Sequence, residues 1–510
     1  MNTQVEPVVA LRRFDRLDRL RTALAGLLLS PALACTPAMG AAPATGTASG
    51  TPRPPAKPFA TGTFIQDWLS AGWDEATWEK EFAYLKEAGM TYIVIAPTAY
   101  TFTTPLPPDS SAPAALATPG ASTAPAAPAA QSGSPPTPII GQTIYPTNLP
   151  GFQQKPGYPD LVEKYLHYAA KYGMKVFVGL NFNDDWWKKA SRDPGWLLEE
   201  MRRGNAVATE LYQRYHSRYP NTFYGWYWVW EIDNYNFRFR DWENTLISAL
   251  NVQLDHLTAL DPSLPFLFCP FMNYRLGTAA QYRDFWKRVF ANTHLRPGDI
   301  FAPQDCVGAG GLTIDNFDTW FAELRKAVDT KPGLLFWSDA ETFVQADWSS
   351  APLSRFVRQL REVAPYVDNI ISFAYTHYYS PNLVDPGFHR TYVDYVRSGG
   401  QLDSEPPSPP TNVRATVLTS SYTPPSVSVE WDAAQDNLGV YSYTVYRDGQ
   451  PVATTKVARP GHPEDAALLL NYVDTNVHPG HAYRYEVRAT DFAGNTSPPS
   501  APIQVEVGQG

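Results

Sequence analysis

Two glutamates, Glu231 and Glu341, each close a strand-like run of residues that is rich in Trp and Tyr. The first run reads FYGWYWVWEIDN and the second GLLFWSDAETF, and they lie far apart in the chain. Two carboxyl groups that flank a glycosidic bond can hydrolyse it: one protonates the leaving oxygen, and the other attacks the sugar or activates water. The flat apolar face of a sugar ring also packs well on an aromatic ring. The two runs therefore point to chemistry on a carbohydrate.

Several other side chains near the expected strand ends are candidates for substrate contact. Asp339 lies two residues before the second glutamate and faces the same side of a strand. Asp305 ends another strand-like run, where it is an alternative second carboxylate or caps amide groups of a loop. A strand-end glutamate can instead form an ion pair, and Arg238 and Arg240 are available to Glu231 for that alternative. The remaining expected contacts of the sugar are Trp68, Asn181, Asn234, Trp337, Tyr375 and His377.

Helix-like and strand-like segments alternate between about residues 58 and 400. Eight strands that alternate with helices predict an α/β fold, the (β/α)8 or TIM barrel. A doubly wound sheet also alternates, but no Gly-rich phosphate loop follows the first strand here. Active sites of the barrel form at the carboxyl ends of its strands, so Glu231 after the fourth strand and Glu341 after the seventh are expected to meet there. The expected strands are 64–68, 92–96, 175–181, 223–231, 266–270, 300–304, 334–341 and 370–375.

The composition excludes several classes of function. The chain has 510 residues, a hydrophobic fraction of 44% and a net charge of −9 that is spread along the sequence. These values fit a globular protein of more than one domain and predict no basic surface for nucleic acid. No spacing of Cys and His resembles a zinc site, so neither a metal nor a cofactor is expected. Cys269 and Cys306 could form one bridge in an oxidising compartment, or both could stay free.

Residues 1–35 have the features of a secretory signal. Five arginines between positions 12 and 21 precede a short apolar stretch at 23–29, and Ala-Leu-Ala follows before Cys35. The apolar stretch is too short to cross a membrane, which takes about 20 residues. Cys35 stands where bacterial lipoproteins carry their lipid, so membrane attachment through Cys35 is one alternative and cleavage to an unanchored protein is the other. In both cases the protein is expected to be secreted, periplasmic or anchored in the cell envelope.

Two stretches of low complexity flank or interrupt the barrel region. Residues 36–57 are rich in Ala, Pro, Thr and Gly and are expected to form a disordered linker. Residues 105–138 are largely Ala, Pro, Ser and Thr. We expect them to be a flexible insertion in one loop of a barrel domain at 58–400, because a long surface loop costs little closure entropy.

From about residue 406 the pattern changes to short alternating strands, with Asp448-Gly449 placed as a hairpin turn. A segment of about 100 residues of this kind predicts a β-sandwich. Residues 406–508 are similar to fibronectin type III domains of secreted bacterial carbohydrate-active enzymes, which implies a spacer or weak-adhesion domain without catalytic chemistry. The matching residues are 409–413 (PPTNV), Trp431, 436–440 (DNLGV), 446–449 (YRDG), 489–491 (ATD) and 493–495 (AGN).

The barrel region also resembles known proteins. The phrases GTFIQDW, WEIDN, APQDCVG and WSDAETF are similar to a group of secreted bacterial glycoside-hydrolase-like barrels of largely unassigned function, over about residues 60–395. The architecture resembles clan A glycosidases, in which the acid/base glutamate ends strand four and the nucleophile glutamate ends strand seven. This resemblance implies a retaining glycoside hydrolase of poly- or oligosaccharides, with Glu231 as acid/base and Glu341 as nucleophile. The alternative is a catalytically inactive carbohydrate-binding or cell-envelope protein on the same barrel.

One residue departs from the clan A pattern. Those enzymes usually place Asn directly before the acid/base, where it holds the 2-hydroxyl of the sugar, and Trp230 occupies that position here. The hydroxyl contact is then expected from another residue, with Asn234 as the candidate.

Overall fold

The computed structural model describes residues 56–106, 138–462 and 469–509. The expected secretory signal at 1–35 lies outside these residues. So do all but two residues of the expected linker at 36–57 and most of the expected insertion at 105–138.

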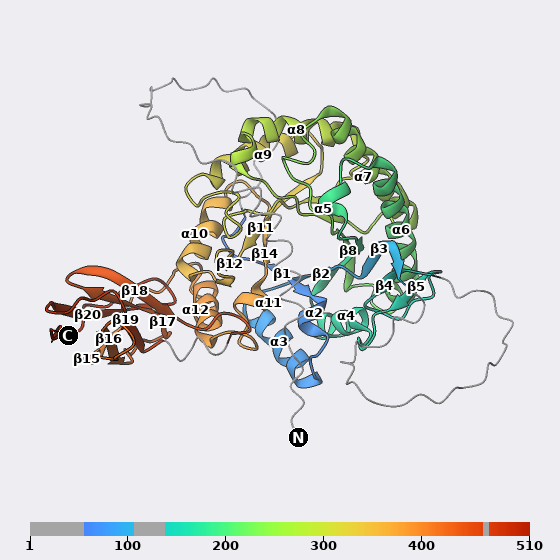
Figure 1. The fold of residues 1–510 in the computed structure, drawn as a ribbon. Coiled ribbons are helices and arrows are strands. Elements are labelled where there is room, and N and C mark those ends of the chain that lie inside the picture. Colours follow the sequence, from blue (N-terminus) through green and yellow to red (C-terminus); the bar gives the residue numbers. More distant parts are fainter. Residues whose placement is uncertain (1–55, 107–137, 463–468, 510) are drawn as a thin grey trace, which may run out of the picture. The chain divides into compact units, whose positions relative to one another are not determined.

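Eight parallel strands close into a barrel, which confirms the predicted fold class (Figure 1). Each strand pairs with the next barrel strand along the chain, and the last pairs with the first through Thr63 and Ser372. The strands fall where the sequence predicts them, although most end a few residues earlier. In chain order they are β1 (Gly62–Gln66), β2 (Tyr92–Ala96), β6 (Lys175–Gly179), β8 (Phe223–Trp228), β9 (Phe266–Phe268), β10 (Ile300–Phe301), β11 (Leu335–Glu341) and β14 (Asn369–Phe373).

Helices surround the barrel as an outer ring (Figure 1). Several begin at a side chain that caps the first turn: Asp74 accepts a hydrogen bond from the amide of Thr77, and Asp160 accepts one from the amide of Glu163. Gly173 ends one helix in the left-handed conformation, which glycine adopts without strain. The long helices are α3 (Glu75–Glu87), α4 (Leu161–Tyr172), α6 (Pro194–Leu211), α7 (Arg240–Leu260), α8 (Ala279–Asn292), α9 (Phe317–Val328), α10 (Leu353–Val363) and α12 (Pro386–Arg397).

Three short helices lie in the loops that follow barrel strands. They are α2 (Asp67–Ser70) after β1, α5 (Trp186–Lys189) in the loop beyond β6, and α11 (Tyr375–Tyr378) after β14.

Alternate residues of the barrel strands face the interior and the helices. On β8 and the residues after it, Trp226, Trp228 and Trp230 pack into the layer between strands and helices, and Tyr227 and Val229 belong to the interior cluster. This alternation follows from the period of two in an extended strand. All three tryptophans in the WYWVW run are therefore core residues between the barrel strands and the helices.

A second, four-stranded sheet is built from the loops beyond β2 and β6. It contains β3 (Ala99–Leu106), β4 (Ile139–Thr143), β5 (Phe152–Gln154) and β7 (Asn181–Phe182). Strands β3 and β4 are antiparallel, and Leu106 pairs with Ile139. The low-complexity insertion thus connects two paired strands, a hairpin that the sequence did not predict.

The described chain begins at the amino-terminal end of the barrel strands. The amide of Ala56 lies 3.2 Å from the carbonyl oxygens of Ala364 and Val367, which belong to the turn that leads into β14. Farther along, the amide of Ala60 donates to the hydroxyl of Tyr392 in α12. Residues 56–60 therefore lie at the end opposite to the loops that follow the strands.

The C-terminal residues form two antiparallel sheets that share one hydrophobic core, as the sequence predicts. Val429 and Trp431 from the first sheet and Tyr443 and Val487 from the second belong to that core. One sheet contains β15 (Thr411–Leu418), β16 (Ser426–Asp432) and β19 (Asn471–Asp474), and the other contains β17 (Val440–Arg447), β18 (Gln450–Lys456), β20 (Ala482–Asp491) and β21 (Ile503–Glu506).

The sandwich packs against the barrel region through aromatic rings. The ring of Phe492 lies 4.7 Å from that of Phe388 in α12 and 5.8 Å from that of Tyr441. Lys456 of β18 also forms an ion pair of 2.8 Å with Asp347. Asp347 lies in the turn between β12 (Phe343–Val344) and β13 (Ser349–Ser350), a hairpin that begins directly after Glu341.

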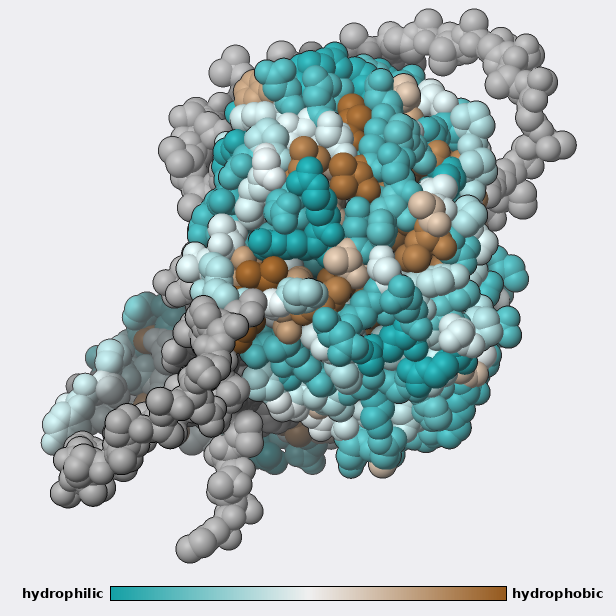
Figure 2. Space-filling view, turned by 90° about the vertical axis from the view of Figure 1, so that its right-hand side faces the viewer, coloured by the Kyte–Doolittle hydropathy of each residue, from teal (hydrophilic) through white to brown (hydrophobic). Residues whose placement is uncertain are grey.

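The surface seen from the side of α6 and β5 is mostly hydrophilic, and hydrophobic residues form separate patches near its middle (Figure 2). Within the described residues, no helix is long and apolar enough to cross a membrane.

Candidate active site

Glu231 and Glu341 lie at the carboxyl end of the barrel. Glu341 is the last residue of β11, the seventh barrel strand, and Glu231 comes three residues after β8, the fourth. Glu231 comes an even number of residues after Tyr227, and Glu341 an even number after Trp337. Both Tyr227 and Trp337 face the barrel interior, and residues an even number apart in an extended chain face the same side. The two carboxylates therefore occupy the interior side of the same barrel end.

Glu231 is held at both its backbone and its side chain. Its carbonyl oxygen accepts a hydrogen bond of 3.0 Å from the indole Nε1 of Trp186 in α5. Gln304 Nε2 donates to Glu231 Oε1 at 3.4 Å and to the carbonyl of Cys269 at 3.2 Å. Gln304 also bridges Asp339 through the backbone, as in a parallel strand. Gln304 is thus the residue that joins the strand-four and strand-seven sides of the site.

Glu341 is only 2% exposed and is covered by the loop that follows β10. The amide of Ala309 donates to Glu341 Oε2 at 2.6 Å. A Cβ atom on Gly308 would lie 2.5 Å from the carbonyl oxygen of Phe343 and 2.9 Å from Glu341 Cβ, so only glycine allows this approach. The backbone carbonyl of Glu341 accepts hydrogen bonds from Arg355 at 3.0 Å and from Gln359 at 3.1 Å, both in α10.

Asp339 lies in the barrel interior below this pair and is only 1% exposed. Its Oδ1 atom is buried and has no hydrogen-bond partner among the described residues. Burial raises the pKa of Asp339 well above its ordinary value, and the negative charges of Glu341, Asp305 and Glu231 raise this pKa further. Burial and these three neighbouring carboxylates therefore both favour the protonated form of Asp339.

Asp305 lies behind Glu341, on the side of α10. Its Oδ2 atom accepts a hydrogen bond of 2.5 Å from Gln359 Nε2, and its Oδ1 atom accepts one of 3.1 Å from the amide of Val307. Burial raises the pKa of Asp305 to about 6, against the lowering effect of these hydrogen bonds. Its bonds match the capping role that the sequence offered as the alternative to catalysis.

Two of the expected aromatic contacts meet at the carboxyl ends of β1 and β14. Trp68 and His377 lie edge to face with ring centroids 5.4 Å apart. Both side chains are partly exposed, and burial lowers the pKa of His377 to about 4, which keeps the imidazole neutral. Tyr378 lies next to His377, and the charge of Glu341 is one cause of its raised pKa.

Three expected contacts lie elsewhere. Trp337 is near the amino-terminal end of β11, in the barrel interior, with its ring 5.0 Å from that of Tyr92. Asn181 is fully buried outside the barrel, where its Nδ2 atom donates to the backbone and side chain of Glu200 in α6. The hydroxyl of Tyr375 is buried 2.7 Å from His389 Nδ1 in α12. The structure thus places these three side chains away from Glu231 and Glu341.

Asn234 connects two loops at the carboxyl end of the barrel. Its Nδ2 atom donates to the carbonyl of Asn273 at 2.9 Å, and its Oδ1 atom accepts from the amide of Asn273 at 3.0 Å. Both ends of the amide are therefore in use within the protein. The side chain of Trp230 points outward against Trp186 and Phe182, away from the barrel interior.

The arginines expected as alternative partners of Glu231 have other contacts. Arg240 pairs with Glu243 at 2.7 Å, and the guanidinium of Arg238 lies over the rings of Tyr235 and Phe239.

The two thiols of the barrel are free and buried. Burial and the charges of Asp339 and Glu231 raise the pKa of Cys269, and burial and the charge of Glu341 raise that of Cys306. Both are therefore unreactive thiols near the carboxylates. Among the described residues, no group of His, Cys, Asp and Glu has a metal-binding arrangement.

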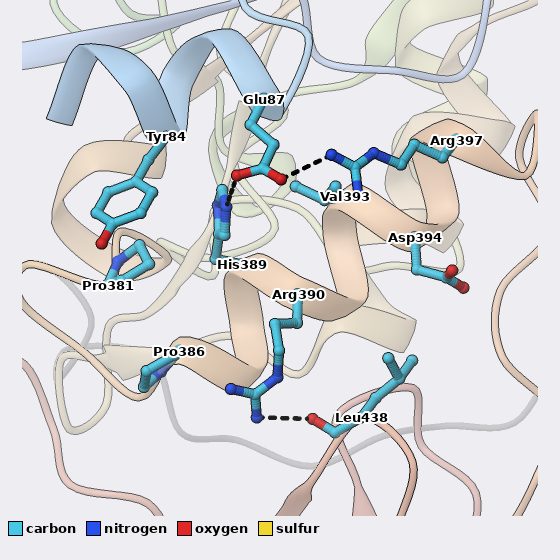
Figure 3. Close-up of a pocket in the computed structure, with 10 residues that line it drawn as sticks. All are labelled: Tyr84, Glu87, Pro381, Pro386, His389, Arg390, Val393, Asp394, Arg397 and Leu438. Carbon is cyan, nitrogen blue, oxygen red and sulfur yellow. Dashed lines mark hydrogen bonds and ion pairs between the residues drawn. The ribbon is translucent and has the colours of Figure 1, made fainter. Parts of the chain in front are cut away.

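A pocket also lies on the outside of the barrel, between α3, α12 and the sandwich (Figure 3). Glu87 points into it and binds both Arg397, at 2.7 Å, and His389, at 3.2 Å. Arg390 donates to the carbonyl of Leu438 at 3.0 Å. These charges are satisfied by one another and by the backbone, so we assign no chemistry to this pocket.

The chemically distinctive residues that the sequence did not single out are Gln304, Gly308 and Ala309. The sequence signal for Gly308 and Ala309 is the glycine-rich run VGAGG after Cys306, and such a run is equally typical of an ordinary turn.

The chain is similar in sequence to parts of several larger proteins. It is 29% identical to Exoglucanase B of Cellulomonas fimi over 234 residues, which are 45% of this chain and 17% of the exoglucanase. It is 34% identical to Chitinase Chi52 of Paenibacillus xylanexedens over 113 residues, which are 22% of this chain and 19% of the chitinase. The chain therefore spans less than a fifth of the length of these curated relatives.

Among solved structures, the chain aligns with a proposed alpha-L-fucosidase from Bacteroides thetaiotaomicron. The TM-score is 0.48 and the identity 19%, over 72% of this chain and 100% of that one. The model of one family, described as "Domain of unknown function (DUF4434)", matches residues 60–385, nearly the whole barrel region. The chain belongs to this DUF4434 family.

Proposed function

We propose that the protein is a retaining glycoside hydrolase of poly- or oligosaccharides, with Glu231 as acid/base and Glu341 as nucleophile. The observation that carries the proposal is the position of the two glutamates on the interior side of the carboxyl ends of strands four and seven. These are the strands on which the clan A glycosidases that the chain resembles carry the same two groups. The names of the sequence relatives, an exoglucanase and a chitinase, support a carbohydrate substrate.

The surroundings of the two carboxylates suit these separate roles. The amide of Ala309 donates to Glu341, and such a bond stabilises the charged form that a nucleophile needs. Glu231 is partly exposed and contacts a neutral amide, Gln304, as suits a group that exchanges protons with leaving group and water.

A covalent pathway follows from these assignments. The Glu341 carboxylate attacks the anomeric carbon while the Glu231 carboxyl protonates the departing oxygen, which gives a glycosyl ester on Glu341 and a free alcohol. The Glu231 carboxylate then takes a proton from water, the water oxygen attacks the anomeric carbon, and the ester bond to Glu341 breaks.

The asymmetry between the two glutamates tests the proposal. We expect Glu341→Gln to abolish turnover of every substrate. Glu231→Gln should keep activity on aryl glycosides whose leaving groups need no proton, and azide should restore turnover of Glu231→Ala by attacking the glycosyl ester. Rates should be measured on aryl glycosides and on a polysaccharide panel with products identified by mass spectrometry. Glu79→Gln, on the exposed face of α3, is the matched control.

Two outcomes would contradict the proposal. If Glu341→Gln stays active while Asp339→Asn or Asp305→Asn is inactive, the second carboxylate is the aspartate whose replacement abolishes turnover. If the unmodified protein binds polysaccharide but no substrate is turned over, the barrel is a binding protein.

Sequence features at the two ends of the chain support two further parts of the proposal. The basic and apolar segments in 1–35 favour an extracytoplasmic location, with lipid attachment at Cys35 as the alternative to release. The sequence motifs of 406–508 favour a fibronectin type III-like role as a spacer.

A further inference from the structure

Two loops next to Glu231 expose aromatic rings to solvent. Phe239, in the loop after β8, is 51% exposed, and Tyr274, in the loop after β9, is 37% exposed. Both loops follow barrel strands and so lie at the same end as the candidate active site. We call Tyr235, Arg238, Phe239, Tyr274 and Arg275 the aromatic–arginine rim.

The rim is braced by hydrogen bonds to the rest of the site. The amide of Phe271 donates to the carbonyl of Ile232 at 2.9 Å, in addition to the paired bonds of Asn234 and Asn273. Asp233 is buried and accepts a bond of 2.7 Å from the amide of Tyr235, which fixes the turn of the first loop.

The loop after β10 connects the rim to Glu341, the proposed nucleophile. The amide of Tyr274 donates to the carbonyl of Gly311, and Arg275 donates to the carbonyl of Gly310, both at 2.9 Å. The same loop carries Ala309, whose amide binds Glu341. The rim and the two glutamates therefore belong to one connected set of loops, and the rim needs little reorganisation to bind a ligand.

The charge of the rim is opposite to that of the whole chain. Residues 235–240 and 273–278 contain three arginines and no acid, whereas the chain as a whole has a net charge of −9. Arg240 is paired with Glu243, and the acid that follows it, Asp241, is exposed in the first turn of α7. Among the described residues, neither Arg238 nor Arg275 is paired with a carboxylate.

Both unpaired guanidinium groups lie over aromatic rings. Arg238 is 4.5 Å from the centroid of Tyr235 and 4.8 Å from that of Phe239, and Arg275 is 4.6 Å from that of Tyr274. A guanidinium held on a ring can still direct N–H groups toward an anion and bind it through two parallel hydrogen bonds. In Arg275 one of these groups, Nη1, also donates to the carbonyl of Gly310. Exposed rings beside the guanidinium provide surfaces for the apolar faces of sugar rings.

We propose that the aromatic–arginine rim binds an acidic polysaccharide, a chain that carries carboxylate or sulfate groups. The rim takes the residues of that chain on the leaving-group side of the cleaved bond, because it begins only four residues after the acid/base Glu231. This assignment of side rests on the proposed function, whereas the binding itself does not.

Binding to a protein that cannot turn over its ligand tests the inference. The probes are polygalacturonate for carboxylate groups, dextran sulfate for sulfate groups and neutral dextran of similar length, titrated into full-length Glu341→Gln at low salt. We expect at least one acidic polymer to bind about tenfold or more tightly than neutral dextran. That preference should shrink as salt rises, because the arginines are exposed.

Arginine variants separate a specific site from general charge. We expect Arg238→Gln combined with Arg275→Gln to lower affinity for the acidic polymer about tenfold and to leave neutral dextran unchanged. Arg488→Gln is the matched control, since Arg488 of the sandwich also lies over a ring, that of Tyr446 at 5.1 Å. Phe239→Ala should weaken all polymers alike, because it removes a stacking surface.

The outcomes of these titrations distinguish recognition of acidic groups from general binding of polymers. Equal affinity for acidic and neutral polymers, or an equal loss in the Arg488→Gln control, would overturn the inference. Preference for one acidic polymer identifies carboxylate or sulfate as the recognised group. Because these measurements need no turnover, a failure of the glutamate test above leaves them interpretable, and the reverse also holds.

Discussion

Asp339 is a buried acid whose pKa is raised by burial and by the charges of Glu341, Asp305 and Glu231. An amide has nearly the same shape as a protonated carboxyl group, so we expect Asp339→Asn to be tolerated. We expect kcat/KM within about tenfold of the parent and an unchanged or higher melting temperature, since the cost of a buried charge cannot arise. A loss of activity as complete as that of Glu341→Gln would show instead that Asp339 is an ionised catalytic group.

Residue identity alone could not show which of the expected side chains lie at the carboxyl end of the barrel. The positions of Glu231 and Glu341 at that end were predictable, because both follow strand-like runs in which alternate residues face the interior. Asn181 and Tyr375 also follow strands, but their side chains turn to the helix layer, and Trp337 has the interior parity at the wrong end of its strand. The direction of a side chain and its position along the barrel axis depend on the register of the strands, and the register cannot be read from the sequence.

At the scale of elements, the loop after β10 holds Glu341, the nucleophile of the proposed function. Gly308→Ala would bring a methyl group to 2.5 Å from the carbonyl oxygen of Phe343 and to 2.9 Å from Glu341 Cβ, so the loop must move. We expect kcat to fall more than tenfold as the bond from Ala309 is lost, and stability to fall by about 1–3 kcal/mol.

Gly310→Ala is the control for this loop. Its φ is +69°, so alanine there is strained, but no atom lies within 4 Å of the added Cβ. We expect it to cost about 1 kcal/mol of stability and leave kcat unchanged. Equal kcat values for the two variants would show that the loop does not position Glu341.

Helix α3 carries a buried acid that should make stability depend on pH. Glu81 accepts hydrogen bonds from Ser380 and Asn382 of the segment after α11, and burial raises its pKa from 4.5 to about 7. The folded state therefore holds more protons than the unfolded state between these values, so the contribution of Glu81 to stability is lost as pH rises through them. A shift of this size corresponds to about 3 kcal/mol.

A neutral replacement should remove this dependence. We expect Glu81→Gln to match the parent near pH 4 and to exceed its free energy of unfolding near pH 8, as measured by denaturant titration. The pKa of Glu79 in the same helix is lowered by its contacts with Lys171 and Tyr172, so Glu79→Gln should show no gain at pH 8. Parallel pH profiles for the parent and Glu81→Gln would contradict the prediction.

The elements themselves were largely predictable. Runs of apolar residues indicate the eight barrel strands, and helical periodicity indicates the helices between them. Residues such as Asp74, Asp160 and Gly173 mark where a helix begins or ends. The β3–β4 hairpin was missed because the low-complexity segment separates Leu106 from Ile139, and pairing across such a distance has no local pattern. The loop around Gly308 was missed because its contacts form only when β10 and β11 are adjacent.

At the scale of the whole molecule, the sandwich and the barrel share an aromatic contact. Phe492 is 2% exposed and its ring lies so close to α12 that a Cβ on Gly387 would be 2.0 Å from it. We expect Phe492→Ala to lower stability by about 3–5 kcal/mol and to separate the unfolding of the sandwich from that of the barrel in calorimetry.

Tyr422→Ala is the control for this contact, since Tyr422 belongs to the same sandwich and is 94% exposed. It should leave the melting temperature unchanged. An equally small effect of Phe492→Ala would show that the two parts fold independently.

The described chain starts at Ala56, which is bound at the amino-terminal end of the barrel, and the two glutamates lie at the other end. A chain that leaves the barrel at Ala56 therefore starts on the face opposite to Glu231 and Glu341. A tag joined directly before Ala56 would start on that opposite face, so the loops that follow the strands stay free for binding measurements.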